Sequence, residues 1–347
     1  MPYPMVGDSP FLPCSRRQWL IGGAASLLFA GQTRAQAPTS EASLAVEPRF
    51  FRLAAGPLGS ATFALAVGLA TGLSNPPGGR GCERGGSCGV PGLIVVAQGA
   101  AQGPRRALDL LRAGQAEAAL VPARELLAWL SAGDANAQDA LRALATLSAE
   151  TLHIFVRQDD PMVDVSELAG QPLALAQGPD AGTGFARQVI GHGHLIKPGE
   201  RAQLMPLEFA LDAVAEGQVR ATMATLWPPN PLVLARARTL PLRLLALGPD
   251  AVSPQVRAAL SVESVAGGLY PGVAAVDTLG HPLLLVVRAD TPAPLAEALV
   301  KALWSPVTLK GLSNLGAVGQ FSLAGARRST LLPLHPGAEA GYAALPK

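Results

Sequence analysis

The sequence is poor in charged residues, and its charges of opposite sign nearly balance. Only 15% of the 347 residues are charged, whereas 49% are hydrophobic. A disordered chain has the opposite composition, so we expect a folded protein with a sizeable core. The 27 basic and 25 acidic residues leave a formal charge of +2. This balance supplies no basic surface for neutralising phosphates, which argues against nucleic-acid binding.

The sequence also lacks a long unbroken hydrophobic run. A membrane-spanning helix needs about 20 mostly apolar residues in succession. The longest uncharged stretch, between Arg52 and Arg80, is interrupted by Pro57, Pro76 and Pro77 and by several glycines. We therefore do not expect this stretch to cross a membrane. The 38 glycines and 31 prolines are scattered without a period, which excludes a collagen-like repeat and indicates many turns.

Motifs for common cofactors and catalytic groups are missing or incomplete. The sequence has no Gly-Lys-Ser/Thr of a phosphate-binding loop and no dinucleotide-binding fingerprint, so we expect no cofactor. Residues 85–89 match Gly-x-Ser-x-Gly, with Ser87 as the candidate nucleophile. That elbow needs a strand before the serine and a helix after it, and the flanking glycines and prolines leave no strand. A serine hydrolase is therefore the least favoured function, and labelling of Ser87 by a fluorophosphonate would be its sign.

The histidines are not arranged as metal ligands. His192 and His194 form a possible pair, but no carboxylate or cysteine is close in sequence. We therefore expect a solvated helix end there, and no metal site. His153 and His281 lie on predicted strands, where we expect them to be packed and hydrogen-bonded.

The first 37 residues have the three-region layout of a secretory signal. Arg16 and Arg17 precede a short stretch rich in glycine and alanine, and Ala35 and Ala37 supply small residues for signal peptidase. Paired arginines followed by an aromatic residue and leucine resemble the twin-arginine type. We expect cleavage after Ala37, or alternatively after Ala35, and a soluble periplasmic protein. The competing interpretation is a buried N-terminal helix.

The sequence has only three cysteines. Cys14 precedes the apolar stretch of the signal, so it is not a lipoprotein cysteine, and only Cys82 and Cys88 remain after cleavage. Because the exported compartment is oxidising, we expect a disulfide between them that shapes a surface loop. Zinc is the poorer alternative, since no nearby histidine or cysteine pair completes four ligands.

Apolar runs typical of strands alternate with helical patterns, as in α/β folds. The predicted strands are residues 49–55, 93–98, 118–121, 152–157 and 283–288. The predicted helices are residues 62–73, 104–113, 184–191, 209–216 and 294–304, and Gly114 is the expected stop of the second.

Two pairs of short segments recur along the chain. Residues 55–64 and 177–186 share glycine, proline, phenylalanine and alanine, and each copy follows a predicted strand and opens a helix. Residues 114–118 and 217–221 each place a glycine between a helix and a strand. The repeats predict two similar α/β lobes that face one another. A loop of small residues that opens a helix could hold a carboxylate or phosphate on free N–H groups, and ordinary turn chemistry is the alternative.

Residues 74–98, Ser-Asn-Pro-Pro-Gly-Gly-Arg-Gly-Cys-Glu-Arg-Gly-Gly-Ser-Cys-Gly-Val-Pro-Gly-Leu-Ile-Val-Val-Ala-Gln, closely resemble a segment of the TAXI family. The ending Pro-Leu-His-Pro-Gly-Ala at 333–338, followed by Tyr342, is similar to that family's ending. TAXI proteins are the solute-binding subunits of TRAP (tripartite ATP-independent periplasmic) transporters. The resemblance implies a type II periplasmic-binding-protein fold, in which two α/β lobes enclose a ligand cleft, and no enzymatic activity.

The resemblance also implies a division of the chain and its partners. We expect a signal peptide at 1–37, the first part of lobe 1 at 38–157, lobe 2 at 158–279, and a return to lobe 1 with the C-terminal segment at 280–347. The partners would be a small anionic organic solute, such as an amino or organic acid, and the membrane permease subunits of a TRAP transporter driven by an ion gradient. The alternative is a periplasmic binding domain that signals to or scaffolds a membrane partner without transport.

The loops and the resemblance together give a set of expected ligand-binding residues. They are Gly56, Gly59, Ser60, Thr62, Arg124, Asp180, Gly182, Thr183, Trp227 and Tyr270. Several of these loops depart from the family pattern, because Pro57 removes an N–H donor, Thr62 stands where the family has tyrosine, and 226–229 read Leu-Trp-Pro-Pro. We therefore expect a carboxylate less polar than glutamate, aromatic or branched, held by Arg124. A pocket that has lost its ligand is the alternative.

The disulfide leads to a first testable outcome. Mature protein prepared from periplasm without reductant should contain no free thiol, because Cys82 and Cys88 are the only cysteines left after the signal is removed. Thiol counting before and after reduction measures this directly. Two free thiols in the unreduced protein would contradict the pairing.

Overall fold

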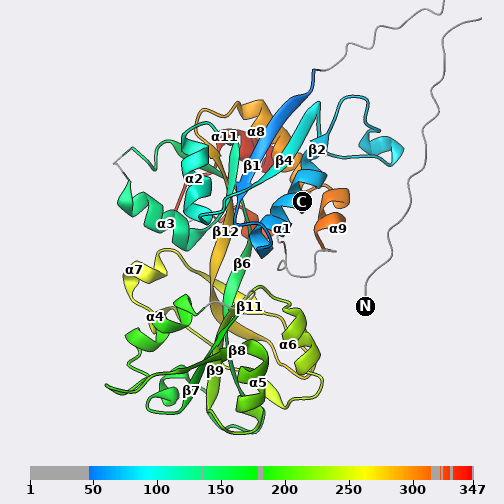
Figure 1. Ribbon diagram of the computed structural model, residues 1–347. Helices are drawn as coiled ribbons and strands as arrows, with labels where there is room; N and C mark the ends of the chain where they lie inside the picture. The colour runs from blue at the N-terminus through cyan, green and yellow to red at the C-terminus, as the bar shows by residue number, and fades with distance from the viewer. Residues whose placement is uncertain are drawn as a thin grey trace, which may run out of the picture. The chain divides into compact units, whose positions relative to one another are not determined.

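The computed structural model describes residues 47–133, 136–178, 183–313, 321, 323–328 and 331–345 (Figure 1). Within these ranges the strands are β1 (Arg49–Ala55), β2 (Ser74–Asn75), β3 (Val90–Pro91), β4 (Leu93–Gly99), β5 (Ala118–Pro122), β6 (Leu141–Arg157), β7 (Leu173–Gln177), β8 (Gln203–Pro206), β9 (Ala221–Leu226), β10 (Leu242–Leu244), β11 (Ser261–Val265) and β12 (Val276–Arg288). The helices are α1 (Ala61–Leu73), α2 (Pro104–Arg112), α3 (Ala123–Ala132), α4 (Gly184–His192), α5 (Leu207–Ala215), α6 (Pro231–Arg236), α7 (Pro254–Arg257), α8 (Ala293–Leu303), α9 (Pro306–Ser313), α10 (Leu323–Ala326) and α11 (Pro336–Ala343).

Two long antiparallel strands, β6 and β12, connect the two parts of the main sheet. The strand order is β4-β1-β5-β12-β6-β9-β7-β8, with β10 added to β6 and β11 added to β12. One end of β12 pairs with β5, whereas the opposite end of β6 pairs with β9. We call the part with β1, β4 and β5 lobe 1 and the part with β7, β8 and β9 lobe 2; β6 and β12 are the crossing strands (Figure 1).

The strand directions decide which ends of the strands face the other lobe. Strand β12 is antiparallel to both β5 and β6, so β5 runs in the same direction as β6, from lobe 1 toward lobe 2. Strand β9 is antiparallel to β6 and therefore runs the other way. Because β1 is parallel to β5 and β7 is parallel to β9, the carboxyl ends of the parallel strands in each lobe point toward the other lobe. Open α/β sheets bind ligands at such carboxyl ends.

Buried apolar side chains cover both faces of the sheet in each lobe. In lobe 1, α1 and α8 bury leucines on one face, and α2 and α3 bury theirs on the other. In lobe 2, α4 contributes to one cluster and α5 and α6 to the second. Trp227, which directly follows β9 of lobe 2, packs in the cluster of α1 and α8 in lobe 1. This side chain therefore ties the end of β9 to the other lobe.

The two predicted repeats correspond to repeated structure. Strands β1 and β7 each end where the Gly-Pro copy begins, and helices α1 and α4 open at its far end. Gly114 and Gly217 follow α2 and α5 with φ values of 68° and 75°, a left-handed conformation that favours glycine and ends a helix. Strands β5 and β9 start a few residues later in each lobe.

The predicted strands and helices are confirmed, with differences at their ends. The largest differences are that β6 begins at Leu141 rather than 152, and β12 at Val276 rather than 283. Polar residues interrupt the apolar pattern where these strands cross between lobes, and apolar periodicity finds only the segments buried within one lobe. Helix α3 starts directly after β5 without a loop, so Arg124 lies in its first turn.

Cys82 and Cys88 are joined by a disulfide, with their Cα atoms 4.4 Å apart. The bridge closes a largely exposed loop between β2 and β3. Within this loop the Ser87 hydroxyl donates to the carbonyl of Ser74 and accepts from the N–H of Gly89 at 3.0 Å. A short β3 follows instead of a helix, so the strand–serine–helix geometry of a nucleophile elbow is not formed.

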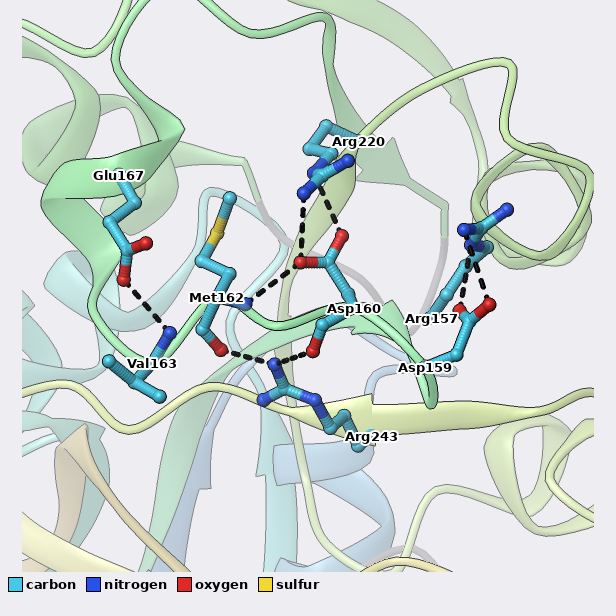
Figure 2. A network of polar contacts seen from close by, with 8 residues as sticks. All are labelled: Arg157, Asp159, Asp160, Met162, Val163, Glu167, Arg220 and Arg243. Carbon is cyan, nitrogen blue, oxygen red and sulfur yellow. Dashed lines mark hydrogen bonds and ion pairs between the residues drawn. The ribbon is translucent and has the colours of Figure 1, made fainter.

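A network of polar contacts holds the turn that follows β6 in lobe 2 (Figure 2). The Asp160 side chain is 2% exposed, and Arg220 Nε and Nη2 lie 2.8 and 3.0 Å from its two carboxylate oxygens. The Met162 N–H donates to Asp160 Oδ1 at 3.0 Å. Arg243 Nη2 donates to the carbonyl oxygens of Asp160, at 2.7 Å, and of Met162. One buried carboxylate thus joins the turn to the residue directly before β9, while Arg243 joins it to β10.

This network predicts unequal effects for two neighbouring aspartates. Asp160→Ala should lower the free energy of unfolding by about 1–3 kcal/mol, because a charged partner and the Met162 N–H lose their acceptor. Asp159→Ala is the matched control, since Asp159 pairs with Arg157 at the surface and such pairs contribute below about 1 kcal/mol. Urea unfolding followed by circular dichroism measures both, and equal losses would contradict the assignment.

Candidate functional site

The loop after β1 is organised mainly by its own side chains. Ser60 caps α1 by accepting from the Phe63 N–H at 3.2 Å, and its hydroxyl donates to the carbonyl of Pro57 at 2.7 Å. The Thr62 hydroxyl lies 3.1 Å from that of Ser60. A Cβ on Gly56 would come within 2.3 Å of the Thr62 hydroxyl oxygen, so a larger residue there would displace this hydroxyl. Much of the hydrogen-bonding capacity of these expected ligand residues is thus used within the loop.

Gly59 has a φ of 83°, which fits its place in this turn. The first turn of α1 and its neighbours Gly56 and Gly59 lie at the carboxyl end of β1, which faces lobe 2. The loop is therefore in position to contribute backbone N–H groups to a cleft, rather than free hydroxyls.

Arg124 stands at the carboxyl end of β5, in the first turn of α3. Its side chain is 38% exposed, and its Nη1 lies 3.7 Å from Glu150 Oε2, while its Nε lies 3.5 Å from Glu125 Oε1. Glu150 belongs to β6, where the strand passes from lobe 1 to lobe 2. Burial raises the pKa of the Glu150 carboxyl, and the nearby Arg124 charge opposes this rise. Arg124 is therefore a partly exposed cation beside the crossing strands.

His281 of β12 lies directly opposite Glu150 of β6 in the antiparallel pairing. It is 2% exposed, and its Nδ1 lies 3.3 Å from the carbonyl oxygen of Ala259, which can only accept. Burial, with a smaller effect of Arg124, lowers the pKa of His281 to about 4, so the ring is neutral near pH 7. Phe185 of α4 in lobe 2 packs on this ring with centroids 4.7 Å apart.

Both lobes and both crossing strands thus contribute side chains to one group of neighbours, which consists of Arg124, Glu150, His281 and Phe185. Among the described residues, His281 Nε2 is buried without a hydrogen-bond partner. Arg124 stays a predicted ligand contact, and the sequence analysis did not single out Glu150 or His281 as its neighbours. Their signal was a charged and a titratable residue within otherwise apolar strands, which becomes informative only when the strand register places them side by side.

The expected site residues of lobe 2 have different positions. Thr183 is the N-cap of α4 and makes no capping hydrogen bond through its side chain. Asp180 and Gly182 lie outside the described residues. Trp227 is 9% exposed and packs in the core of lobe 1, at the place where the two lobes meet.

Tyr270 is fully buried in the core of lobe 2 rather than in a cleft. Its hydroxyl accepts from the Asn230 N–H at 3.1 Å and lies 3.2 Å from His153 Nε2. His153 Nδ1 is 3.2 Å from the carbonyl oxygen of Thr151, so Nδ1 carries the proton and Nε2 accepts from Tyr270. Both hydrogen-bonding ends of this pair are used inside the core, which leaves Tyr270 no surface for a solute.

A pocket of about 400 Å³ lies against the crossing strands, a size suitable for a small molecule. It is lined by Thr146, Leu147, Ser148, Ala149 and Thr151 of β6, Pro282 of β12, residues 260–264 around β11, and Pro228, Leu269, Gly325 and Arg328. The Ser148 hydroxyl oxygen is buried without a partner among the described residues. Polar side chains of β6 and apolar side chains of the surrounding segments thus form one concave surface.

No cluster of three or more metal-ligating side chains occurs in the described part of the chain. His192 and His194 are exposed at the end of α4. Over the same residues, no helix is long and apolar enough to cross a membrane.

Residues 53–343 match the model of the NMT1-like family. The chain belongs to this family. Among solved structures, it is similar to a TctC solute-binding protein from Polaromonas, with a TM-score of 0.50 and 16% sequence identity over 79% of this chain and 91% of that one. The aliphatic sulphonate-binding protein SsuA from Escherichia coli matches with a TM-score of 0.43 and 13% identity, over 78% of this chain and 76% of that one.

The comparison with TctC shows that the NMT1-like chain has the two-lobe α/β fold of periplasmic solute-binding proteins. The predicted fold class is therefore confirmed. Open α/β sheets bind ligands at the carboxyl ends of their strands, so the facing carboxyl ends and the crossing strands form the candidate site.

The buried ring of His281 leads to a prediction for the stability of the protein at acid pH. The unfolded chain takes up a proton at His281 below pH 6.5, whereas the folded chain resists this until about pH 4. The stability that depends on a neutral ring is therefore complete above 6.5 and is lost as the pH falls toward 4. His281→Asn should make this loss shallower in denaturant unfolding at several pH values. An equal change for the exposed His192→Asn control would refute the assignment.

Proposed function

We propose that the protein is a periplasmic solute-binding receptor that captures a small carboxylate between its lobes and delivers it to the permease of a TRAP transporter. The observation that carries this proposal is Arg124, a partly exposed guanidinium at the carboxyl end of β5, beside the strands that join the lobes. Guanidinium groups bind carboxylates through charge-assisted hydrogen bonds. The fold and the NMT1-like family membership support solute binding as the general activity.

The assignment to a TRAP transporter rests on the TAXI-like segment at 74–98. In the structure this segment comprises β2, the exposed loop that carries the Cys82–Cys88 disulfide, β3 and all of β4 but its last residue. Binding proteins of this kind work with a membrane permease, so the proposal includes such a partner and export to the periplasm by a twin-arginine-type signal that is removed after Ala37 or Ala35. The Val-Pro-Gly that follows the second cysteine leads into β4, the edge strand of lobe 1.

The proposed contacts of the cleft suit an anion. Proposed contacts are Arg124, the N–H groups near Gly56 and Gly59, and the start of α4 at Thr183, where the helix dipole favours negative charge. Asp180 and Gly182 remain proposed contacts from the sequence. The used hydroxyls of Ser60 and Thr62 leave Arg124 as the dominant polar contact of lobe 1.

Native mass spectrometry of mature protein from periplasm, followed by a thermal-shift screen of carboxylates, tests this function. We expect a co-purified small acid, or a raised midpoint with one class of carboxylate, because a ligand that binds only the folded state stabilises it. An empty protein that no acid stabilises would contradict the receptor and favour a domain that signals or scaffolds without transport.

Arg124→Ala should then weaken binding of the acid found in that screen by about 1.5–3 kcal/mol, the range for hydrogen bonds to charged groups. Arg257→Ala is the matched control, since Arg257 is an ion-paired arginine on lobe 2 next to Asp250. Isothermal titration calorimetry gives both affinities, and an unchanged affinity for Arg124→Ala would remove it from the site.

A further inference from the structure

Four charged side chains form a chain of ion pairs along the carboxyl ends of the lobe 1 strands. Arg105, at the start of α2, has its Nε 3.1 Å from Glu125 Oε2, and Glu125 Oε1 lies 3.5 Å from Arg124 Nε. Arg124 Nη1 in turn lies 3.7 Å from Glu150 Oε2. The signs alternate along this chain, and Glu150, with 15% of its side chain exposed, is its most buried member.

The two carboxylates depend on Arg124 to different degrees. Glu125 has a second cation, because Arg105 Nε donates a hydrogen bond to it. Glu150 has Arg124 as its ion-pair partner among the described residues, and their separation of 3.7 Å exceeds an ordinary hydrogen bond. In the same part of the chain, no group donates a hydrogen bond to the Glu150 carboxylate. The charge of Glu150 is therefore stabilised by Arg124 alone.

The other neighbours of Glu150 do not replace that cation. His281 of β12 lies directly opposite Glu150, and its ring is neutral near pH 7. The Phe185 ring of α4, which packs on His281, carries no charge. Burial raises the pKa of Glu150, and the charge of Arg124 opposes this rise. A negatively charged ligand on Arg124 therefore favours protonation of Glu150.

The burial of Arg124 Nε limits how a carboxylate can bind this side chain. A carboxylate that accepts two parallel hydrogen bonds from a guanidinium uses either the two Nη groups or Nε with one of them. Arg124 Nε is buried, whereas 38% of the whole side chain is exposed. An incoming carboxylate is thus left with the two Nη groups, and Nη1 is the one beside Glu150. The solute and Glu150 therefore compete for the same end of Arg124.

We propose that Glu150 is a positioning residue for Arg124, and that Glu150 takes up a proton from solvent when an anionic solute binds the guanidinium. In the free protein, the negative charge of Glu150 attracts Nη1 and balances the guanidinium. A bound carboxylate would leave two negative charges beside one cation, which is unfavourable where burial weakens screening. A proton on Glu150 restores the balance and leaves a carboxyl group that can still accept a hydrogen bond. This inference rests on the proposed function.

Proton uptake fixes the sign of a pH dependence. The affinity for the solute should fall as the pH rises through the pKa range of Glu150, by up to about ten-fold per pH unit for one proton. Below this range Glu150 is already neutral, and above it the complex keeps both negative charges. The affinity should therefore be constant on either side of the range.

Calorimetric titration in pairs of buffers with different ionisation enthalpies measures the proton directly. The probes are 4-methylpentanoate, 3-phenylpropanoate and any acid that raises the midpoint in the carboxylate screen. Between about pH 5 and 8, we expect the heats to reveal uptake of up to about one proton per bound acid. Glu150→Gln should bind without this uptake and, at the upper end of the range, more tightly than the unmutated protein, because a negative charge is gone. Glu125→Gln is the matched control and should keep the uptake, since Arg105 balances Glu125.

The outcomes separate this inference from the proposed function. If the acids bind without proton uptake and Arg124→Ala weakens them, the proton linkage is wrong and the carboxylate receptor stands. If no acid binds, both are wrong. Uptake that persists in Glu150→Gln, or a lower affinity of this variant at every pH, would overturn the role of Glu150.

A second measurement applies if Glu150→Gln fails to fold. Infrared difference spectra of the unmutated protein, recorded with and without the bound acid, report protonation of a side-chain carboxylate. We expect a carboxylic acid band to replace a carboxylate band when the acid binds. Binding without this exchange of bands would overturn the proposal.

Discussion

The pairing of β6 with β12 is the interaction on which the rest of the structure depends. Their pairing extends from Leu141 and Arg288 at one end to Thr151 and Gly280 at the other, with two register shifts between them. Every other strand of the main sheet attaches to this pair directly or through neighbours. Because β5 and β9 bind to it in opposite directions, the carboxyl ends of both lobes are turned toward one another. The location of a cleft thus follows from the direction of two strands rather than from any single loop.

The crossing strands carry two buried histidines, His153 on β6 and His281 on β12, whose hydrogen bonding differs. Burial lowers the pKa of both His153 and His281 to about 4. His153 resolves the cost of burial with hydrogen bonds at both nitrogens, to Thr151 and Tyr270. His281 satisfies one nitrogen and leaves the other unpartnered, next to a carboxylate with free acceptor capacity. Two buried rings on neighbouring strands thus differ in how far their hydrogen-bonding capacity is used.

Apolar periodicity and turn chemistry were sufficient to predict most of the fold. Residues 49–55 and 104–113 have patterns that local burial determines, and the structure follows them within a residue. Strands β6 and β12 were predicted too short because polar residues, such as Glu150 and Thr278, interrupt their apolar pattern. Tyr270 could not be placed because a buried aromatic and a cleft aromatic look alike in sequence. The pairing of Glu150 with His281 depends on register across 131 residues, which no local pattern encodes.

The two crossing strands also end alike. Both run into Val-Arg-x-Asp-x-Pro, at 156–161 and 287–292, and in each the arginine pairs with the aspartate two residues on. Arg157 lies near Gly217, and Arg288 lies near Gly114, and both glycines have a left-handed conformation. In each lobe, the arginine at the end of a crossing strand thus lies beside the glycine that follows a helix. The symmetry stops at the centre, where Glu150 and His281 differ from one another in charge and hydrogen bonding. The similar strand ends therefore set the frame of the two lobes, whereas the residues at the centre of the crossing strands are specific to each strand.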